Sequence, residues 1–181
     1  MSEANISQKG VNIMTEFEIY RGSNTERYVL GTKGNKTLVI IGINPSTADE
    51  ERTDRTITRV IKHTQQFGYD SFKMINIYPL RATNFNKLPK EFNEKLHKQN
   101  IIEIKKTIET ASAVLCAWGT HINDRKYFKI CYSDILKIIS GTTLPTYCLG
   151  VTKHGHPLHP LLRGIATPEK LVEFDMINYN V

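Results

Sequence analysis

The run Leu38-Val39-Ile40-Ile41 constrains the fold of this chain more than any other feature of the sequence. Its four consecutive apolar residues, rich in β-branched side chains, lie between the turn-forming pairs Gly34-Asn35 and Asn44-Pro45. Consecutive rather than alternating apolar residues are typical of a strand that is buried on both faces of a sheet, as in α/β proteins. The run therefore predicts a buried strand that ends at about Ile43.

Strand and helix patterns alternate along the rest of the chain. The expected elements are strands over 17–20, 27–30 and 38–43, a helix over 54–67, a strand over 72–77, a helix over 93–110, a strand over 113–118, a helix over 126–139, a strand over 146–149 and a short helix over 169–174. The alternation predicts a three-layer α/β/α fold with a mainly parallel central sheet. The first two strands are expected as an antiparallel addition at one edge.

Length and composition fit one soluble domain. The chain has 181 residues, of which 40% are hydrophobic and 23% are charged, and it has no repetitive or Pro/Gly-rich tract, which excludes a disordered or repeat protein. No segment approaches the ~20 apolar residues that a membrane span needs, and the N-terminus lacks a secretory pattern. We expect a flexible tail over 1–13, a single domain over 14–181, a cytoplasmic location and no membrane contact.

Charge and cysteine content bear on partners and cofactors. The net charge is 24 − 18 = +6, which is compatible with a nucleic acid or nucleotide as partner, although many basic domains bind nothing charged. The cysteines Cys116, Cys131 and Cys148 are far apart and form no Cys-x-x-Cys pair. A disulfide framework, a metal site and a cofactor are therefore not expected. The sequence carries no signal for the oligomeric state.

Unusual polar residues gather where the expected strands stop, in segments 44–49, 78–84, 118–121 and 153–163. The carboxyl ends of parallel strands meet at one edge of a sheet, and ligands bind there. The sequence therefore predicts a ligand site formed by these four segments. Thr83 and Trp118 belong to them and are candidate substrate-binding residues.

The segment after the first buried strand offers several groups for such a site. Gly42 lets the backbone approach a ligand closely, and Pro45 fixes the turn. The side-chain amide of Asn44 can orient a water molecule, and Ser46 can bind substrate. The structural alternative is a turn with an Asx-type hydrogen bond at Asn44 and a helix cap at Ser46.

Charged and polar residues further along give additional candidates. Asp49 and Asp54 are possible general bases, although each can equally be a favourable charge at a helix N-terminus. Asn76 interrupts an otherwise apolar strand, so it either finds partners or reads the edge of a ligand. Arg81 suits a phosphate or carboxylate, and Tyr78 either stacks on a base or packs in the core.

Segment 153–163 holds three of the six histidines. The prolines that follow His156 and His159 favour extended geometry and present both rings. A metal is disfavoured, because no Asp or Glu lies nearby to complete a ligand set. Histidines that stabilise a leaving group, with Lys153 and Arg163 on phosphates, fit the segment better. A rigid basic surface loop is the alternative.

The order of the motifs carries a resemblance to known proteins. The motifs GINPSTAD at 42–49, DRTI at 54–57, RAT at 81–83, AWG at 117–119 and GHPLHPL at 155–161 resemble a family of uncharacterised bacterial and phage proteins, over about residues 27–163. More distantly, the same order is similar to the uracil-DNA glycosylase superfamily. That similarity implies a fold of uracil-DNA glycosylase type and a role in DNA repair or modification.

The distant similarity also implies roles for individual residues. Asn44 would position the attacking water, the segment 76–84 would read the base, and one of the two His-Pro histidines would stabilise the departing base. The four cysteines that hold an iron–sulfur cluster in some members are absent, so no cluster is implied. No aromatic residue closely follows the first motif, so Phe85, Tyr78 or Trp118 would provide the stacking surface.

The sequence thus predicts a hydrolase that cleaves the N-glycosidic bond of a nucleobase. His156 or His159 would stabilise the leaving base. Because an amide cannot act as a base, such an enzyme is slow unless Asp49 or Asp54 assists Asn44. Two alternatives stay open, namely a non-catalytic module that binds a nucleotide or nucleic acid, and an interaction protein that recruits or blocks another DNA enzyme.

Overall fold

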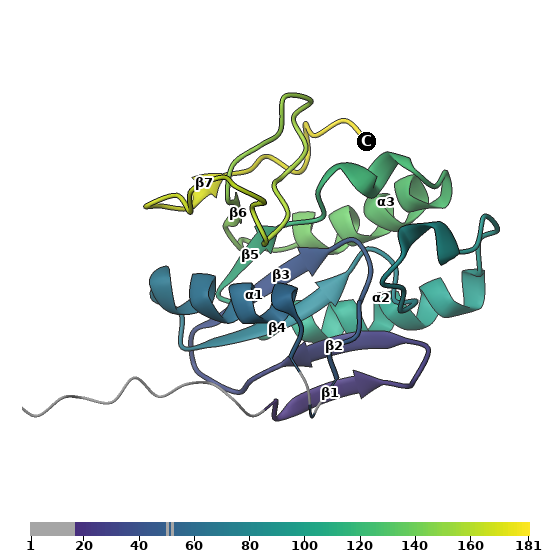
Figure 1. Ribbon diagram of the computed structural model, residues 1–181, viewed down its shortest axis with the longest axis horizontal. Helices are drawn as coiled ribbons and strands as arrows, with labels where there is room; N and C mark the ends of the chain where they lie inside the picture. The colour runs from purple at the N-terminus through teal and green to yellow at the C-terminus, as the bar shows by residue number, and fades with distance from the viewer. Residues whose placement is uncertain (1–16, 50, 52) are drawn as a thin grey trace, which may run out of the picture.

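The computed structural model describes residues 17–49, 51 and 53–181, and the tail expected over 1–13 lies outside them. Within these residues, a seven-stranded sheet has the order β1-β2-β4-β3-β5-β6-β7 (Figure 1). The strands are β1 (Ile19–Gly22), β2 (Arg27–Gly31), β3 (Thr37–Gly42), β4 (Ser71–Asn76), β5 (Ala113–Cys116), β6 (Thr146–Cys148) and β7 (Val172–Glu173). The helices are α1 (Arg55–Gln66), α2 (Glu94–Ile108) and α3 (Tyr127–Ser140), with short 3-10 helices η1 (Phe85–Lys87) and η2 (Thr120–Asn123).

The sheet is mixed, and the prediction of a mainly parallel sheet is wrong. The four central strands β4, β3, β5 and β6 are parallel to one another. At the two edges, β1, β2 and β7 run antiparallel to their neighbours. The sequence predicts the antiparallel edge formed by β1 and β2. It does not predict the antiparallel strand β7 at the opposite edge.

The C-terminal segment is extended where the sequence predicts a short helix over 169–174, and that prediction is wrong. The N–H of Phe174 donates to the carbonyl oxygen of Thr146 at 2.9 Å, and the hydroxyl of Thr146 donates to the carbonyl oxygen of Phe174. The buried ring of Phe174 packs against Trp118. A helix of one or two turns has little stability by itself, so the open edge of β6 and the buried aromatic side chain decide the conformation.

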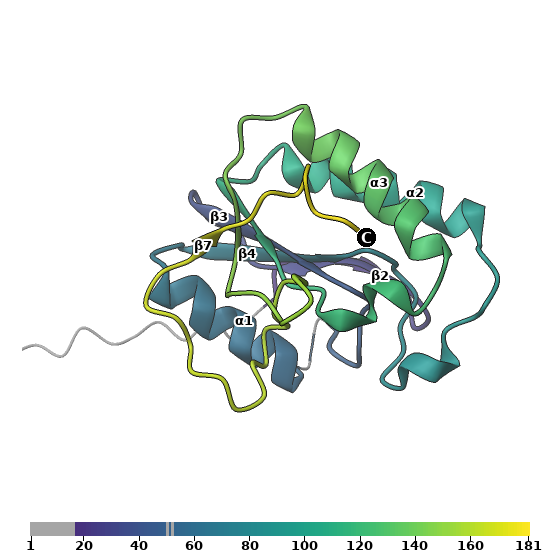
Figure 2. The ribbon, with the colours of Figure 1, turned by 90° about the horizontal axis from the view of Figure 1, so that it is seen from above.

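Helices cover both faces of the sheet, as expected for three layers. Figure 2 shows α1 on one face and α2 with α3 on the other. The central strand β3 is buried at all six positions, as its run of apolar residues predicts. Among the described residues, no helix combines the length and the apolar character needed to cross a membrane.

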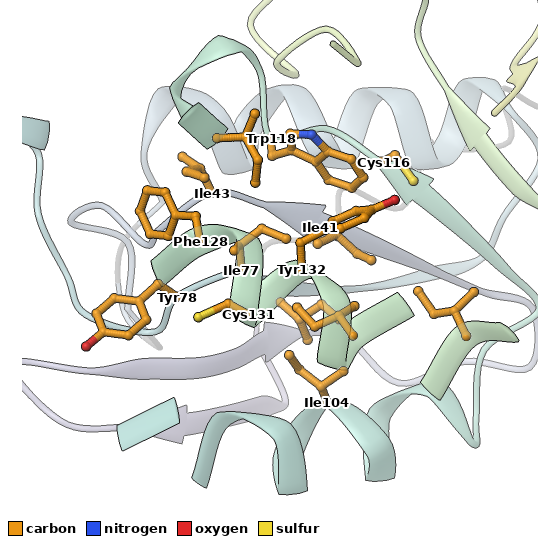
Figure 3. Close-up of a cluster of buried hydrophobic side chains, with 14 of the residues drawn as sticks. Ile41, Ile43, Ile77, Tyr78, Ile104, Cys116, Trp118, Phe128, Cys131 and Tyr132 are labelled. Carbon is orange, nitrogen blue, oxygen red and sulfur yellow. The ribbon is translucent and has the colours of Figure 1, made fainter. Parts of the chain in front are cut away.

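The layer between the sheet and helices α2 and α3 is rich in aromatic side chains (Figure 3). The ring of Trp118 lies edge-on to Tyr132 at 5.5 Å between centroids, and Tyr78 contacts Phe128 at 6.2 Å. Trp118 and Tyr78 are both fully buried. Because these two rings are packed in the core, they fix the positions at which the loops after β5 and β4 begin.

Candidate functional site

A cavity of about 470 Å³ lies at the carboxyl ends of the four parallel strands. Its walls come from residues within 42–46 after β3, 82–85 after β4, 118–121 after β5 and 152–165 after β6. The amino end of α1 and the first residue of β2 also line it. The volume is within the range of pockets that hold small molecules. The four polar segments that the sequence singles out therefore meet in one place.

The cavity separates the candidate residues into two groups. The candidates that line it are Gly42, Asn44, Ser46, Asp54, Thr83, Trp118, His159 and Arg163. The candidates that do not line it are Pro45, Asp49, Asn76, Tyr78, Arg81, Lys153 and His156.

The side chain of Asn44 connects the ends of β3 and β4. Its Nδ2 donates to the carbonyl oxygens of Ala82 at 2.9 Å and of Pro45 at 3.0 Å. Because both neighbours are acceptors, the NH2 group must face them. Among the described residues, the side-chain oxygen of Asn44 has no hydrogen-bond partner. An amide oxygen held in this way can accept a hydrogen bond from a water molecule or a ligand hydroxyl.

Asp54 caps the amino end of α1 with one carboxylate oxygen and leaves the other unpaired. Its Oδ1 accepts a hydrogen bond from the N–H of Ile57 at 2.9 Å. Its Oδ2 is buried and has no partner among the described residues. Buried polar atoms without a partner are rare in folded proteins, and a bound ligand or a catalytic role is one explanation for such an atom. Of the two acidic candidates, Asp54 lines the cavity and Asp49 does not.

The ring of His159 is held in one neutral form. Its Nδ1 accepts a hydrogen bond from the N–H of Leu161 at 3.3 Å, so the proton of the neutral ring is on Nε2. Burial, with the help of nearby Arg163, lowers the pKa of His159 to about 4, and Asp54 opposes this shift only in part. Near pH 7 the ring is therefore neutral and offers one N–H donor.

The turn that carries His159 is fixed by contacts that offset backbone strain. Leu162 and Arg163 have φ angles of 54° and 22°, a region that residues other than glycine rarely adopt. The side chain of Leu162 is buried, and Nε2 of His63 in α1 donates to the carbonyl oxygen of Pro160 at 3.0 Å. Core packing and a helix contact therefore hold the turn in place.

His156 belongs to the core rather than to the cavity. Its Nδ1 lies 2.6 Å from the hydroxyl oxygen of Tyr179, and the indole N–H of Trp118 donates to that same oxygen at 3.2 Å. The residue is 8% exposed. The two His-Pro histidines thus differ in position, since His159 lines the cavity and His156 supports the wall behind it.

Asn76 lies behind Gly42, which lines the cavity. The two residues are paired across β3 and β4, and a Cβ atom at Gly42 would come within 2.8 Å of the Oδ1 of Asn76. Asn76 is fully buried, and neither polar atom of its side chain has a partner among the described residues. Gly42 is therefore required for the amide to lie against the cavity-lining backbone.

Three other candidates lie outside the cavity, and two of them form hydrogen bonds within the protein. Arg81 donates from Nε to the carbonyl oxygen of Ser46 at 3.2 Å and from Nη2 to that of Thr47 at 2.8 Å, so its guanidinium fixes the loop after β3. The hydroxyl of Tyr78 lies in the core, 3.3 Å from the N–H of Asn93. Lys153 is exposed.

Arg27 is a cavity residue that the sequence pattern does not indicate. It is the first residue of β2, and its N–H donates to the carbonyl oxygen of Pro79 at 2.9 Å. Because β2 is antiparallel to β4, its amino end lies at the edge where the parallel strands have their carboxyl ends. Arg27 is 2% exposed, and burial lowers its pKa to about 10, so the side chain stays charged near pH 7.

Phe85 and His121 give the cavity an aromatic surface. Their rings are stacked, with centroids 4.6 Å apart and planes inclined by 16°. Of the three aromatic candidates, Phe85 alone is partly exposed, because Trp118 and Tyr78 are fully buried. Within the part of the chain that the structure describes, no group of three or more His, Cys, Asp or Glu side chains is placed to hold a metal ion.

The family model with the description "Protein of unknown function (DUF1643)" matches residues 27–161. The match covers most of the chain, and the chain belongs to this family. The expectation of an uncharacterised domain family is thereby confirmed, and the matched region runs from Arg27 to the turn that carries His159. No curated protein and no solved structure matches the chain.

Proposed function

We propose that this protein hydrolyses the N-glycosidic bond between a nucleobase and its sugar, and that its fold is related to that of the uracil-DNA glycosylases. One observation carries the proposal: Asn44, Asp54 and a neutral His159 line the same cavity. Together they offer an amide that orients water, a carboxylate that accepts a proton, and an N–H donor for the leaving base.

These groups match the chemistry of the bond that breaks. Cleavage passes through an oxocarbenium-like sugar while negative charge develops on the departing base. Water held by Asn44 forms the new C–O bond at the anomeric carbon and loses a proton to Asp54. The C–N bond breaks, and its electron pair goes to the base. The Nε2–H of His159 then stabilises the base anion by a hydrogen bond, for which a neutral ring suffices.

Two further features support a nucleobase as the leaving group. The stacked pair of Phe85 and His121 presents an aromatic surface to the cavity. The order of the sequence motifs adds to the similarity with base-releasing enzymes.

Base release is the direct test. Oligonucleotides and free nucleotides carrying uracil, mismatched thymine, hypoxanthine or hypermodified pyrimidines are incubated with the protein and the freed base is quantified. The variants His159→Gln and Asn44→Ala are expected to lower the rate by about a hundredfold or more. Lys105→Gln, an exposed position on α2, is the control and is expected to keep the wild-type rate.

Loss of release in both variants, with release by the control, supports the proposal. If the folded wild-type protein releases no base from any substrate of the panel, the hydrolase proposal fails. The non-catalytic binding module then becomes the better description of the cavity.

A further inference from the structure

The geometry points to a free nucleoside monophosphate as the ligand of the cavity, with its phosphate bound by Arg27. This inference rests on the proposed function, since it takes the same cavity as the substrate site and names the class of substrate. The sequence suggests Arg81, Lys153 and Arg163 for phosphate, and of these Arg163 alone lines the cavity. The inference instead assigns the phosphate to a residue that the sequence does not indicate.

Arg27 is a buried cation with an unused donor. Its Nη1 donates to the carbonyl oxygen of Ala48 at 2.7 Å, whereas its Nε is buried and has no partner among the described residues. Asp54 and Asp49 favour its charged form, but burial outweighs them and lowers the pKa of Arg27. Burying a guanidinium costs free energy that an anion with oxygen acceptors can offset. A phosphate supplies both the charge and the acceptors.

The residues that line the cavity include one group for each part of a nucleotide. Asp54 and Asp49 are near enough to Arg27 to influence its pKa, whereas Arg163, Asp54 and His121 influence that of His159. Arg27, Asp54 and His159 all line the same cavity. In this assignment the phosphate binds at Arg27, the sugar lies at Asp54, where water attacks, and the base lies at His159.

The burial of Arg27 favours a free nucleotide over a polymer. Proteins that bind a polymer contact successive phosphates with exposed cations along a surface. Here the cation is 2% exposed and is reached through a cavity of about 470 Å³, a volume suited to one small molecule. A terminal phosphate can enter such a cavity, because only one of its oxygens is esterified.

Equilibrium binding to the full-length protein tests the inference without requiring turnover. Isothermal titration compares deoxynucleoside 5′-monophosphates with the matching nucleosides, with inorganic phosphate and with short oligonucleotides of the same bases. The monophosphate is expected to bind at least about tenfold more tightly than its nucleoside. Arg27→Gln is expected to remove this advantage, Arg27→Lys to keep part of it, and the control Lys105→Gln to keep all of it.

Three results would overturn the inference. They are equal affinity for monophosphate and nucleoside, tighter binding of oligonucleotides than of monophosphates, and an unchanged phosphate advantage in folded Arg27→Gln. If Arg27→Gln does not fold, the comparison of ligands on the wild-type protein still tests whether a free monophosphate is the preferred ligand. Base release from oligonucleotides without monophosphate binding supports the proposed function and rejects this inference. Monophosphate binding without base release supports this inference and rejects the proposed function.

Discussion

The imidazole of His159 accepts its hydrogen bond from the backbone N–H of Leu161, two residues further along the same turn. The tautomer of this ring is therefore set by the local path of the chain and not by a carboxylate partner. His156 has a similar sequence context, with a proline after it, but its Nδ1 faces the hydroxyl of Tyr179 in the core. The two rings thus differ in what they can do, and separate experiments distinguish them.

Stability should depend on pH through His159. Its pKa of about 4 lies below the ordinary value of 6.5, so the unfolded chain binds more protons between these two values. The free energy of unfolding is therefore expected to rise from pH 4 to pH 6.5 and to level off above, with up to about 3 kcal/mol from this residue. Urea denaturation at a series of pH values measures the slope.

His159→Gln is the matched control, because glutamine keeps polarity but does not titrate. Burial also lowers the pKa of His63 and His156, so the wild-type slope contains their contributions. The difference between the two proteins isolates His159. Parallel curves for wild type and His159→Gln would show that the folded protein does not disfavour the charged ring.

Tyr179→Phe is expected to lower stability while leaving the cavity chemistry intact. The change removes the hydroxyl that joins Trp118 to His156 and leaves two buried groups without their partner. The expected loss is about 1–3 kcal/mol in the free energy of unfolding, measured by urea denaturation with the fluorescence of Trp118. The base-release rate of the folded fraction is expected to stay unchanged, and a large fall in that rate would instead assign His156 to the reaction.

The sequence predicts the layers of this fold well because they depend on local periodicity. The buried run at β3 and the 3–4 spacing of Ile57, Val60 and Ile61 in α1 each indicate their element without reference to distant residues. β7 is missed because two residues carry no periodic signal, and their conformation depends on the open edge of β6. The sheet is mixed because β1 and β2 at one edge and β7 at the other run antiparallel to their neighbours.

The candidate site could be predicted only in part. Asn44, Asp54 and His159 follow from the principle that ligands bind at the carboxyl ends of parallel strands. Arg27 does not, because it begins an antiparallel strand and reaches the same edge from the opposite direction. The choice between the two His-Pro histidines depends on the path of an irregular loop, which no periodic pattern describes.

Gly42 and Asn76 should be energetically coupled. Gly42→Ala brings a Cβ atom within 2.8 Å of the amide oxygen of Asn76 and within 2.5 Å of the terminal methyl group of the flexible Met74 side chain. The variant is expected to lose about 1–3 kcal/mol of stability through overpacking. In an Asn76→Ala background the loss should fall by about 1 kcal/mol, because the stiffer of the two neighbours is gone. Additive effects in the double-mutant cycle of unfolding free energies would contradict the contact.

The single variant Asn76→Ala tests whether the buried amide of this residue is unpaired. Its buried amide has no partner among the described residues, so its removal relieves a desolvation penalty that offsets the lost packing. We expect a stability within about 1 kcal/mol of the wild type, in contrast to the larger cost of most buried truncations. A loss of several kcal/mol would mean that the amide is paired in solution.

Asp54→Asn separates the two roles of this residue at the amino end of α1. The asparagine oxygen can still accept the hydrogen bond from the N–H of Ile57, and asparagine is as good an N-cap as aspartate. The variant is therefore expected to lose less than about 1 kcal/mol of stability. It cannot accept a proton from water, so base release should fall by about a hundredfold to ten-thousandfold.

Asp54→Ala provides the comparison, since it removes the cap and the carboxylate together. That variant is expected to lose about 0.5–2 kcal/mol of stability and to show the same low rate as Asp54→Asn. Urea denaturation and base release are measured on both variants. If Asp54→Asn keeps the wild-type rate, Asp54 is not the base of the reaction. The unpaired Oδ2 then has no part in the reaction, and Asn44 must orient the water without a base.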